Sequence, residues 1–136
     1  MPSSSIEIVR QLYAEFYNQP DSVIAMQTCQ RLFEFPGQSH FDEHLRLRTA
    51  FPNWQVVIER LITEGDTIVV RWTAQGDQTG TLAHPLVTVP PTGRHVVITG
   101  TSIYEIRAGR VASRIPERAE VEFLRQLGVQ FLPPAP

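Results

Sequence analysis

The spacing of apolar residues changes near Trp54, and this change constrains the fold more than any other feature of the sequence. Before Trp54, apolar residues recur every three or four positions, which is typical of amphipathic helices. After Trp54 they alternate with polar residues, as in strands that have one buried face. In α/β folds, strands and helices alternate along the chain, whereas here the helices come first and the strands follow. The pattern therefore predicts an α+β fold.

Three helices are expected ahead of the strands. The serines at 3–5 can cap the first helix, whose apolar face includes Tyr13. A second helix follows, with Val23 and Met26 on its apolar side. The hydroxyl of Ser39 is expected to cap the third helix. Together the helices would supply an apolar layer against the strands.

Four strands and a closing helix are expected after position 54. A tight turn at 108–109 joins the last two strands, and the final helix should begin near Pro116 and end at Gly128. Gly76 and Gly100 interrupt two of the strands, and because glycine marks bulges and bends, the sheet should be curved. The expected strands lie, in order, within WQVVIERLI, TIVVRWTAQG, VPPTGRHVVITGTSIYEIR and RVASRI.

These elements predict a cone-shaped, curved antiparallel sheet with the N-terminal helices packed on one face and a short C-terminal helix. Such a sheet encloses a cavity, which is the default site for a small apolar or aromatic ligand. The 136 residues fit a single domain, with an ordered core at about 5–130 and a proline-rich tail at 131–136. An open curved sheet also has an outer face that a second subunit can cover, so we expect a homodimer.

Composition limits the other partners. The formal net charge is −2, and the basic residues are scattered along the chain, which argues against a nucleic-acid partner. No apolar run approaches the roughly 20 residues that a membrane helix requires, and the N-terminus does not have the pattern of a signal peptide. Cys29 is the only cysteine, so an intrachain disulfide is excluded. We therefore expect a soluble, cytoplasmic protein without a nucleic-acid or membrane partner.

Several segments, taken together, resemble one known family. They are IEIVRQLYAEFYNQPD, AFPNWQVVIERLITEGDTIVVRWTAQGDQTG, PPTGRHVVITGTSIYEIRAGRV and LRQLGV. In this order they resemble the SnoaL-like polyketide cyclase family, which belongs to the nuclear transport factor 2-like superfamily of α+β cone folds. The resemblance covers most of residues 6–129.

The resemblance implies a reaction as well as a fold. Cyclases of this family close a ring by aldol chemistry, using acid–base catalysis without metal or organic cofactor. An aspartate near the end of the final strand moves the proton, and a histidine two residues past a strand glycine assists. In this chain the aspartate position falls on Pro116 and the histidine position on Ser102. Both expected catalytic residues are therefore absent, and the resemblance implies the fold more strongly than the reaction.

Arg114 and Glu117 are the candidate catalytic residues nearby. Strand alternation gives Arg114 the facing of Pro116, so it would point inward and stabilise developing negative charge. The alternatives are an internal salt bridge to Glu117 or Glu120, or a facing reversed by a bulge. Glu117 could move a proton at the cavity mouth, where burial would raise its pKa. Its alternative is an acidic residue in the first turn of the last helix. The predicted pocket-lining residues are Tyr13, Trp72, Ser102, Tyr104, Arg114 and Pro116.

The histidines and the cysteine predict no metal site. His40 and His44 are four positions apart and could share a metal, but the zinc-protease pattern and a third ligand with suitable spacing are missing. We therefore expect solvated or helix-capping histidines there. His84 and His95 could reach the pocket rim, but surface positions are the simpler expectation for both. Cys29 has no activating partner nearby in sequence, so a buried, inert thiol is expected. No cofactor is expected either.

Two functions stay open from the sequence. One is a small-molecule pocket protein that is a cofactor-independent acid–base enzyme of the cyclase, isomerase or hydratase type. The other is a non-catalytic ligand-binding or dimerisation module of the same fold. An open pocket with convergent Arg, Glu or His side chains would favour the enzyme. An interior filled with Leu, Ile and Phe would favour the module.

Overall fold

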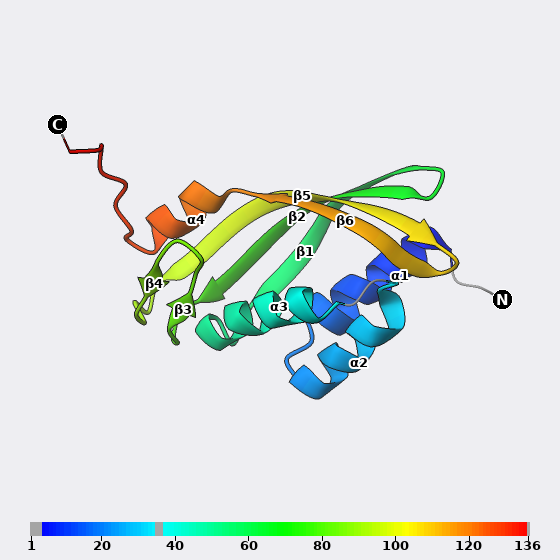
Figure 1. Cartoon of the computed structure of the whole chain (residues 1–136), viewed down its shortest axis with the longest axis horizontal. Coiled ribbons are helices and arrows are strands. Elements are labelled where there is room, and N and C mark those ends of the chain that lie inside the picture. Colours follow the sequence, from blue (N-terminus) through cyan, green and yellow to red (C-terminus); the bar gives the residue numbers. More distant parts are fainter. Residues whose placement is uncertain (1–3, 35–36, 136) are drawn as a thin grey trace.

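The structure combines an antiparallel sheet with helices on one of its faces. A computed structural model describes residues 4–34 and 37–135. The sheet has the order β1-β2-β5-β6, and a two-stranded hairpin, β3–β4, is separate from it. Figure 1 shows the N-terminal helices on one side of the sheet and α4 at the end of β6, which confirms the predicted α+β class. The elements are α1 Ser5–Leu12, the π-helix η1 Tyr13–Tyr17, α2 Ser22–Leu32, α3 Gln38–Ala50, β1 Gln55–Glu64, β2 Thr67–Asp77, β3 Leu82–Ala83, β4 Thr88–Val89, β5 His95–Arg107, β6 Arg110–Arg118 and α4 Glu120–Gln126.

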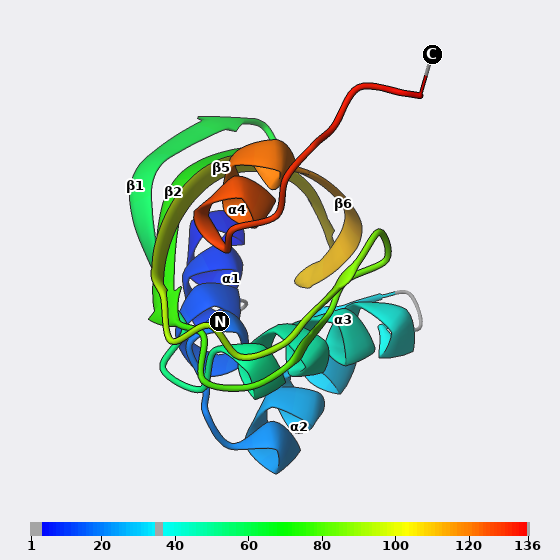
Figure 2. The same ribbon diagram turned by 90° about the vertical axis from the view of Figure 1, so that its left-hand side faces the viewer.

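The sheet is strongly curved, and its concave face is buried. In the view of Figure 2 the strands curve around α1, while α3 and the β3–β4 hairpin lie across the open side. Alternate residues of a strand face the same side, so one set from each central strand lines the concave face. The pairs on this face include Ile68 with Tyr104, Val70 with Ser102 and Ala74 with Ile98.

Gly76 and Gly100 do not mark the bulges of the sheet. The register shifts lie at 58–60 and at 105–106 instead. Gly100 is the ladder partner of Trp72, and a Cβ atom at position 100 would lie 2.1 Å from Cζ2 of the Trp72 indole. Such an approach is far inside van der Waals contact. The absence of a side chain at Gly100 therefore makes room for the indole on the concave face.

Helix α1 continues directly into one turn of π-helix. Its N-cap is Ser4, whose side chain forms a reciprocal capping box with Glu7, in agreement with the predicted serine cap. In η1 the N–H of Asn18 donates to the carbonyl of Tyr13 at 3.0 Å, which spans five residues rather than four. The wider turn leaves Tyr13 and Tyr17 both buried. Single π-turns of this kind are frequent at functional sites.

Two predicted details of the next helices were wrong. In α2, Val23 is 63% exposed, because the helix packs through its small residues, with Ala25 and Cys29 buried. In α3 the N-cap is Gly37, without a side-chain hydrogen bond. Ser39 lies inside the first turn, so its hydroxyl does not cap this helix.

The last strand is longer, and the last helix begins later, than predicted. Pro116 and Glu117 both lie in β6 with ladder partners on β5, so the predicted helix start near Pro116 was wrong. Proline is tolerated here because β6 is an edge strand of the sheet. The predicted end is confirmed: Gly128 follows α4 with φ of +88°, a conformation that favours glycine.

Two side-chain amides bind the backbone of strands. The N–H of Val56 donates to Oδ1 of Asn18 at 2.7 Å, and Nδ2 of Asn18 donates to the carbonyl of Val56 at 2.8 Å. Gln126 of α4 binds the N–H and the carbonyl of Val97 in the same way, at 2.9 and 2.8 Å. The first pair fixes β1 to the end of η1, and the second fixes α4 to β5.

The ends of the chain carry little regular structure. Residues 129–135 form no helix or strand and lead away from the sheet. In the predicted loop FEFPGQ, Phe35 and Pro36 lie outside the described residues. The domain limits at 5 and 130 stay predictions. Within the described ranges, no helix is long and apolar enough to cross a membrane.

Candidate functional site

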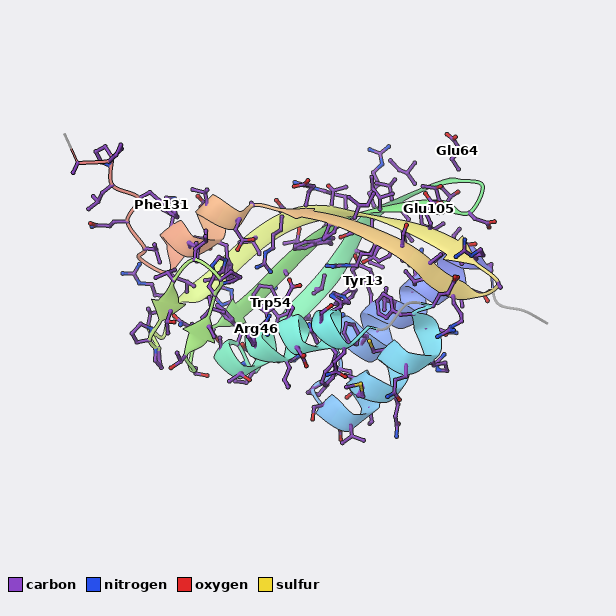
Figure 3. The ribbon with its side chains drawn as sticks, viewed as in Figure 1. Tyr13, Arg46, Trp54, Glu64, Glu105 and Phe131 are labelled. Atoms are coloured by element: carbon purple, nitrogen blue, oxygen red, sulfur yellow. The ribbon has the colours of Figure 1, made fainter. Side chains whose placement is uncertain are left out.

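A cavity of about 820 Å³ lies between the concave face of the sheet and the helices. Residues of η1, α3, the hairpin and all four sheet strands contribute to its wall. Figure 3 shows Tyr13 and Trp54 in the space between the sheet and the helices, with Trp54 nearer to the hairpin. The residues that were predicted to line a pocket all border this cavity: Tyr13, Trp72, Ser102, Tyr104, Arg114 and Pro116.

Three tyrosines and a histidine are joined by hydrogen bonds at the inner end of the cavity. The hydroxyl oxygens of Tyr13 and Tyr104 are 3.1 Å apart, and those of Tyr104 and Tyr17 are 3.2 Å apart. The hydroxyl of Tyr17 is 3.0 Å from Nε2 of His40. We call these four residues the tyrosine–histidine chain. Burial raises the pKa of each tyrosine above its ordinary value, so all three hydroxyls keep their protons at neutral pH.

Arg114 brings a positive charge to the same end of the cavity. It is the ladder partner of Tyr104, and its Cζ lies 6.0 Å from the ring centre of Tyr17. Its Nε is buried, with no hydrogen-bond partner among the residues that the structure describes. Burial opposes the charge, but Tyr17, Tyr104 and Glu43 keep the pKa of Arg114 above its ordinary value. The side chain therefore stays a cation.

The predicted alternative for Arg114, a salt bridge to a nearby carboxylate, is not what the structure contains. Glu120 pairs with Arg118 instead. Across residues 4–34 and 37–135, Arg114 forms no ion pair within 4 Å. Its charge therefore faces the cavity end without a direct counter-ion from the described part of the chain.

His40 and His44 are buried, so the prediction of solvated or helix-capping histidines was wrong. Their exposed fractions are 9% and 6%, and the ring of Phe16 lies 5.3 and 4.8 Å from theirs, centre to centre. The reason is visible in the spacing of α3, because positions 40 and 44 continue to Leu47 and Phe51 in one helical stripe. This periodicity was the signal that could have placed both histidines inside.

Both histidines are neutral at neutral pH. Burial, together with the positive charge of Arg114, lowers the pKa of His40 to about 2. Burial and the charge of Arg48 lower the pKa of His44 to about 4. His40 therefore takes part in the tyrosine–histidine chain as a neutral imidazole, which has one N–H and one lone pair.

Ser102 and Pro116, at the positions where the family pattern has a histidine and an aspartate, are direct ladder partners. Ser102 is 1% exposed, and its Oγ accepts a hydrogen bond from Nε1 of Trp72 at 3.2 Å. A serine hydroxyl in this state and a proline ring do not form an acid–base pair. Proton transfer in this cavity would need other groups.

A second polar cluster, made of His84, Arg118 and Glu120, lies at the cavity mouth. Nε2 of His84 is 2.6 Å from Oε1 of Glu120, and Nε of Arg118 is 2.5 Å from Oε2. The N–H of Leu86 donates a hydrogen bond to Nδ1 of His84 at 3.0 Å. Nε2 is therefore the nitrogen that donates a hydrogen bond to Glu120. Burial opposes the charge of Glu120, but Arg118 and His84 lower its pKa below the ordinary value. This mouth cluster fastens the β3–β4 hairpin to α4.

The two remaining histidines differ from each other. The side chain of His84 is only 6% exposed and borders the cavity, so the surface position preferred for it was wrong and the alternative, the pocket rim, is the position observed. His95 is half exposed and pairs with Asp77 at 2.7 Å, which confirms the surface position predicted for it.

Two carboxylates border the cavity without an ion pair in the part of the chain that the structure describes. Glu117 borders the cavity on β6, but it is the ladder partner of Thr101 and so belongs to the set of residues that alternate toward the convex face. Glu43 lies on the face of α3 that lines the cavity, one turn after His40, and it attracts the charge of Arg114. Sequence reasoning missed Glu43, although the stripe that buries the histidines also places it at the border.

The structure offers no grouping of side chains typical of a metal centre. Among the described residues, no set of three or more His, Cys, Asp and Glu side chains could hold a metal ion. The thiol of Cys29 is buried, as predicted, and burial raises its pKa to about 11. A protonated thiol of this kind is a poor nucleophile.

Comparison with known proteins identifies relatives for both sequence and fold. A family model described as SnoaL-like polyketide cyclase matches residues 7–127, whereas no curated protein matches the chain. A SnoaL-like protein from Jannaschia sp. CCS1 is 20% identical over 93% of this chain and 92% of its own, with a TM-score of 0.78. TsrD from Streptomyces laurentii is 21% identical over 94% and 98%, with a TM-score of 0.75. IdmH from Streptomyces antibioticus is 21% identical over 93% and 100%, with a TM-score of 0.71. At these identities the structures support the fold.

Replacing the two buried histidines should make the fold less sensitive to acid. Their pKa values are lowered in the folded state, so the unfolded chain binds protons first as the pH falls below about 6.5. Each histidine should then lower the free energy of unfolding by up to about 1.4 kcal/mol per pH unit. This loss continues down to the folded-state pKa, about 2 for His40 and about 4 for His44. Urea unfolding of the wild type and of the double variant His40→Phe/His44→Phe between pH 7 and about 4.5 measures this slope. Equal slopes for the two proteins would contradict the prediction.

Proposed function

The chain belongs to the SnoaL-like polyketide cyclase family, and we propose that its cavity binds a small, largely apolar ligand through an oxygen that carries negative charge. The observation that supports this most is Arg114, a half-buried cation whose Nε is buried and which has no carboxylate partner in the described residues. A buried charge without a counter-ion is costly. An enolate, phenolate or carboxylate oxygen of a ligand would provide the missing partner.

The residues in the walls of the cavity suit an aromatic or bicyclic ligand. Trp54 and Trp72 offer flat apolar surfaces, and Leu47 and Leu82 complete the wall between the inner end and the mouth. A volume of about 820 Å³ lies in the range of drug-sized ligand pockets. The ligand would place its oxygen near Arg114 and its apolar frame between the tryptophans.

For a ligand with a carbonyl group, the proposed chemistry is removal of a proton from the adjacent carbon. The proton moves to a carboxylate at the cavity border, and the C–H electron pair becomes part of a new C=C bond while the carbonyl oxygen becomes an enolate oxygen. Arg114 and a tyrosine hydroxyl stabilise that oxygen. Return of the proton to a different carbon of a conjugated enolate completes an isomerisation. Attack of the enolate carbon on a second carbonyl carbon instead closes a ring and leaves an alkoxide oxygen, which takes the proton back from the carboxyl group. These reaction steps need neither a metal nor an organic cofactor.

A non-catalytic binding module is the second candidate function. Pro116 and Ser102 support it, because neither can move a proton at the positions where the family pattern has an acid–base pair. The two candidates share the ligand and differ in proton transfer. A measurement of proton exchange on a bound ketone therefore separates them.

We also propose that the convex face of the sheet is a homodimer interface. Four large apolar side chains of this face are exposed: Val57 at 44%, Ile62 at 53%, Val97 at 46% and Ile115 at 56%. The strand register places them on the side opposite to the cavity. An apolar surface gathered on one face is typical of an interaction site, and a second copy with the same face is the simplest partner.

The charge of Arg114 should decide the binding of a phenolate. The anion of 2-naphthol resembles a bicyclic enolate, and hydrogen bonds to charged groups contribute roughly 1.5–3 kcal/mol. Arg114→Gln should therefore weaken its binding by about 10- to 100-fold, measured by tryptophan fluorescence. Arg118→Gln is the matched control, because the charge of Arg118 is already paired with Glu120. Binding of 2-methylnaphthalene should change in neither variant. Equal loss of naphtholate binding in both variants would contradict the role of Arg114.

The carboxylate that accepts the proton can be identified with 2-tetralone. We expect the protein to accelerate deuterium exchange at C1 of this ketone in D2O, followed by NMR. Because alternation turns Glu117 toward the convex face, Glu43→Gln should lower the rate about 100-fold or more, while Glu117→Gln should retain most of it. The opposite result would assign proton transfer to Glu117, which stays a predicted catalytic residue until then. No acceleration by the wild type would favour the binding module.

Sedimentation velocity tests the proposed dimer. The wild type should sediment as a dimer, and Ile115→Asp should sediment as a monomer because a charge would be buried in the apolar interface. Leu132→Asp is a suitable control, since Leu132 is 79% exposed but lies in the C-terminal tail. A monomeric wild type, or a dimer that persists in Ile115→Asp, would contradict this interface.

A further inference from the structure

The tyrosine–histidine chain has a direction, because a hydroxyl group has only one proton to donate. Each of the three tyrosines can donate one hydrogen bond and accept others. If Tyr17 donates to Tyr104, and Tyr104 to Tyr13, the O–H of Tyr13 is left free at the cavity end of the series. If the direction is reversed, the free O–H is that of Tyr17, beside His40. The distances of 3.1, 3.2 and 3.0 Å allow either direction.

The state of His40 decides between the two directions. A neutral imidazole has its proton on Nε2 or on Nδ1, and Nδ1 of His40 is buried without a hydrogen-bond partner among residues 4–34 and 37–135. A proton on Nδ1 would be a buried donor without an acceptor, whereas a proton on Nε2 has the Tyr17 oxygen as acceptor at 3.0 Å. Buried N–H groups without partners are rare in proteins. The lowered pKa of His40 excludes the doubly protonated ring at neutral pH.

With the proton on Nε2, the direction of the whole chain follows. His40 donates to Tyr17, and the Tyr104 oxygen at 3.2 Å is then the acceptor for the buried Tyr17 O–H, which would otherwise be an unsatisfied donor. By the same reasoning Tyr104 donates to Tyr13 at 3.1 Å. Arg114, beside Tyr17 and Tyr104, cannot reverse this order, because a guanidinium group has donors and no acceptor. Ser102 also forms a hydrogen bond with Tyr13, and because this bond acts to lower the pKa of Tyr13, Ser102 is its donor. Every hydroxyl proton of the three tyrosines except that of Tyr13 is then used inside the chain.

We infer that His40, acting through Tyr17 and Tyr104, keeps the O–H of Tyr13 available as a hydrogen-bond donor to an oxygen of the bound ligand. Tyr13 lines the cavity. His40 is then a positioning residue that never touches the ligand. The inference rests on the proposed function, since it requires a ligand with a carbonyl or enolate oxygen. It adds a neutral donor to the charge of Arg114, and two donors at one oxygen form an oxyanion site.

The tautomer of His40 can be measured without any ligand. NMR spectra of protein labelled with ¹⁵N-histidine, with the His40 signals identified by their loss in His40→Phe, should show a protonated Nε2 and an unprotonated Nδ1 at neutral pH. This pattern should persist to pH about 4, in line with the lowered pKa. A proton on Nδ1 would overturn the inference, whatever the protein binds.

The donor role of Tyr13 can be measured on bound 2-tetralone. The infrared C=O stretch of this ketone should lie at lower frequency in the wild-type complex than in hexane, because a hydrogen bond weakens the C=O bond. Tyr13→Phe removes the donor and should abolish that part of the shift which Arg114 does not cause. His40→Glu should have the same effect, because a carboxylate only accepts and would reverse the chain. His44→Glu is the matched control, with the same charge on the same face of α3 but outside the chain, and it should keep the shift.

Each contrary result has its own meaning. An unchanged shift in Tyr13→Phe would overturn the inference while leaving ligand binding intact. An unchanged shift in His40→Glu, or equal losses in His40→Glu and His44→Glu, would show that His40 does not set the direction and would overturn it as well. Failure of the wild type to bind 2-tetralone would contradict the proposed function itself, and the inference with it.

Discussion

The approach of the Trp72 indole to Gly100 is the contact on which the shape of the interior depends. With a side chain at position 100, the indole would be displaced from the concave face, because the added Cβ would lie 2.1 Å from it. In its observed place the ring donates to Ser102 and covers the middle of the sheet. The cavity is therefore bounded by a flat aromatic surface on the side of the strands, with the polar groups displaced toward its two ends.

The inner end shows how an apolar interior can hold a cation. Arg114 has tyrosine rings and hydroxyls around it instead of a carboxylate at contact distance, and the neighbouring histidines remain neutral. A full ion pair would have satisfied the charge and left nothing for a ligand. The arrangement keeps the positive potential directed into the cavity, which suits an anionic oxygen better than a neutral apolar molecule.

Some residues of this site could be predicted from the periodicity of strands and helices, and others depend on contacts that no local pattern shows. Strand alternation was sufficient to place Arg114, Ser102 and Tyr104 beside one space, because period two fixes facing. Alternation also placed Pro116 at the cavity, but the helix start predicted there was wrong, because an edge strand tolerates proline. His40 was misplaced because polarity was weighed above helical periodicity. The tyrosine–histidine chain was beyond reach, since it depends on the extra residue of a π-turn that no local pattern announced.

The amides of Asn18 and Gln126 have a consequence for how copies of this protein meet. Each occupies the outward N–H and C=O groups of a strand residue, Val56 in β1 and Val97 in β5. Along β6, Phe33 bridges to Val111 in parallel. Unpaired strand edges are templates for the addition of foreign strands and for aggregation. At these positions the backbone groups are already occupied, so a foreign strand could not pair there without displacing the amides of Asn18 and Gln126.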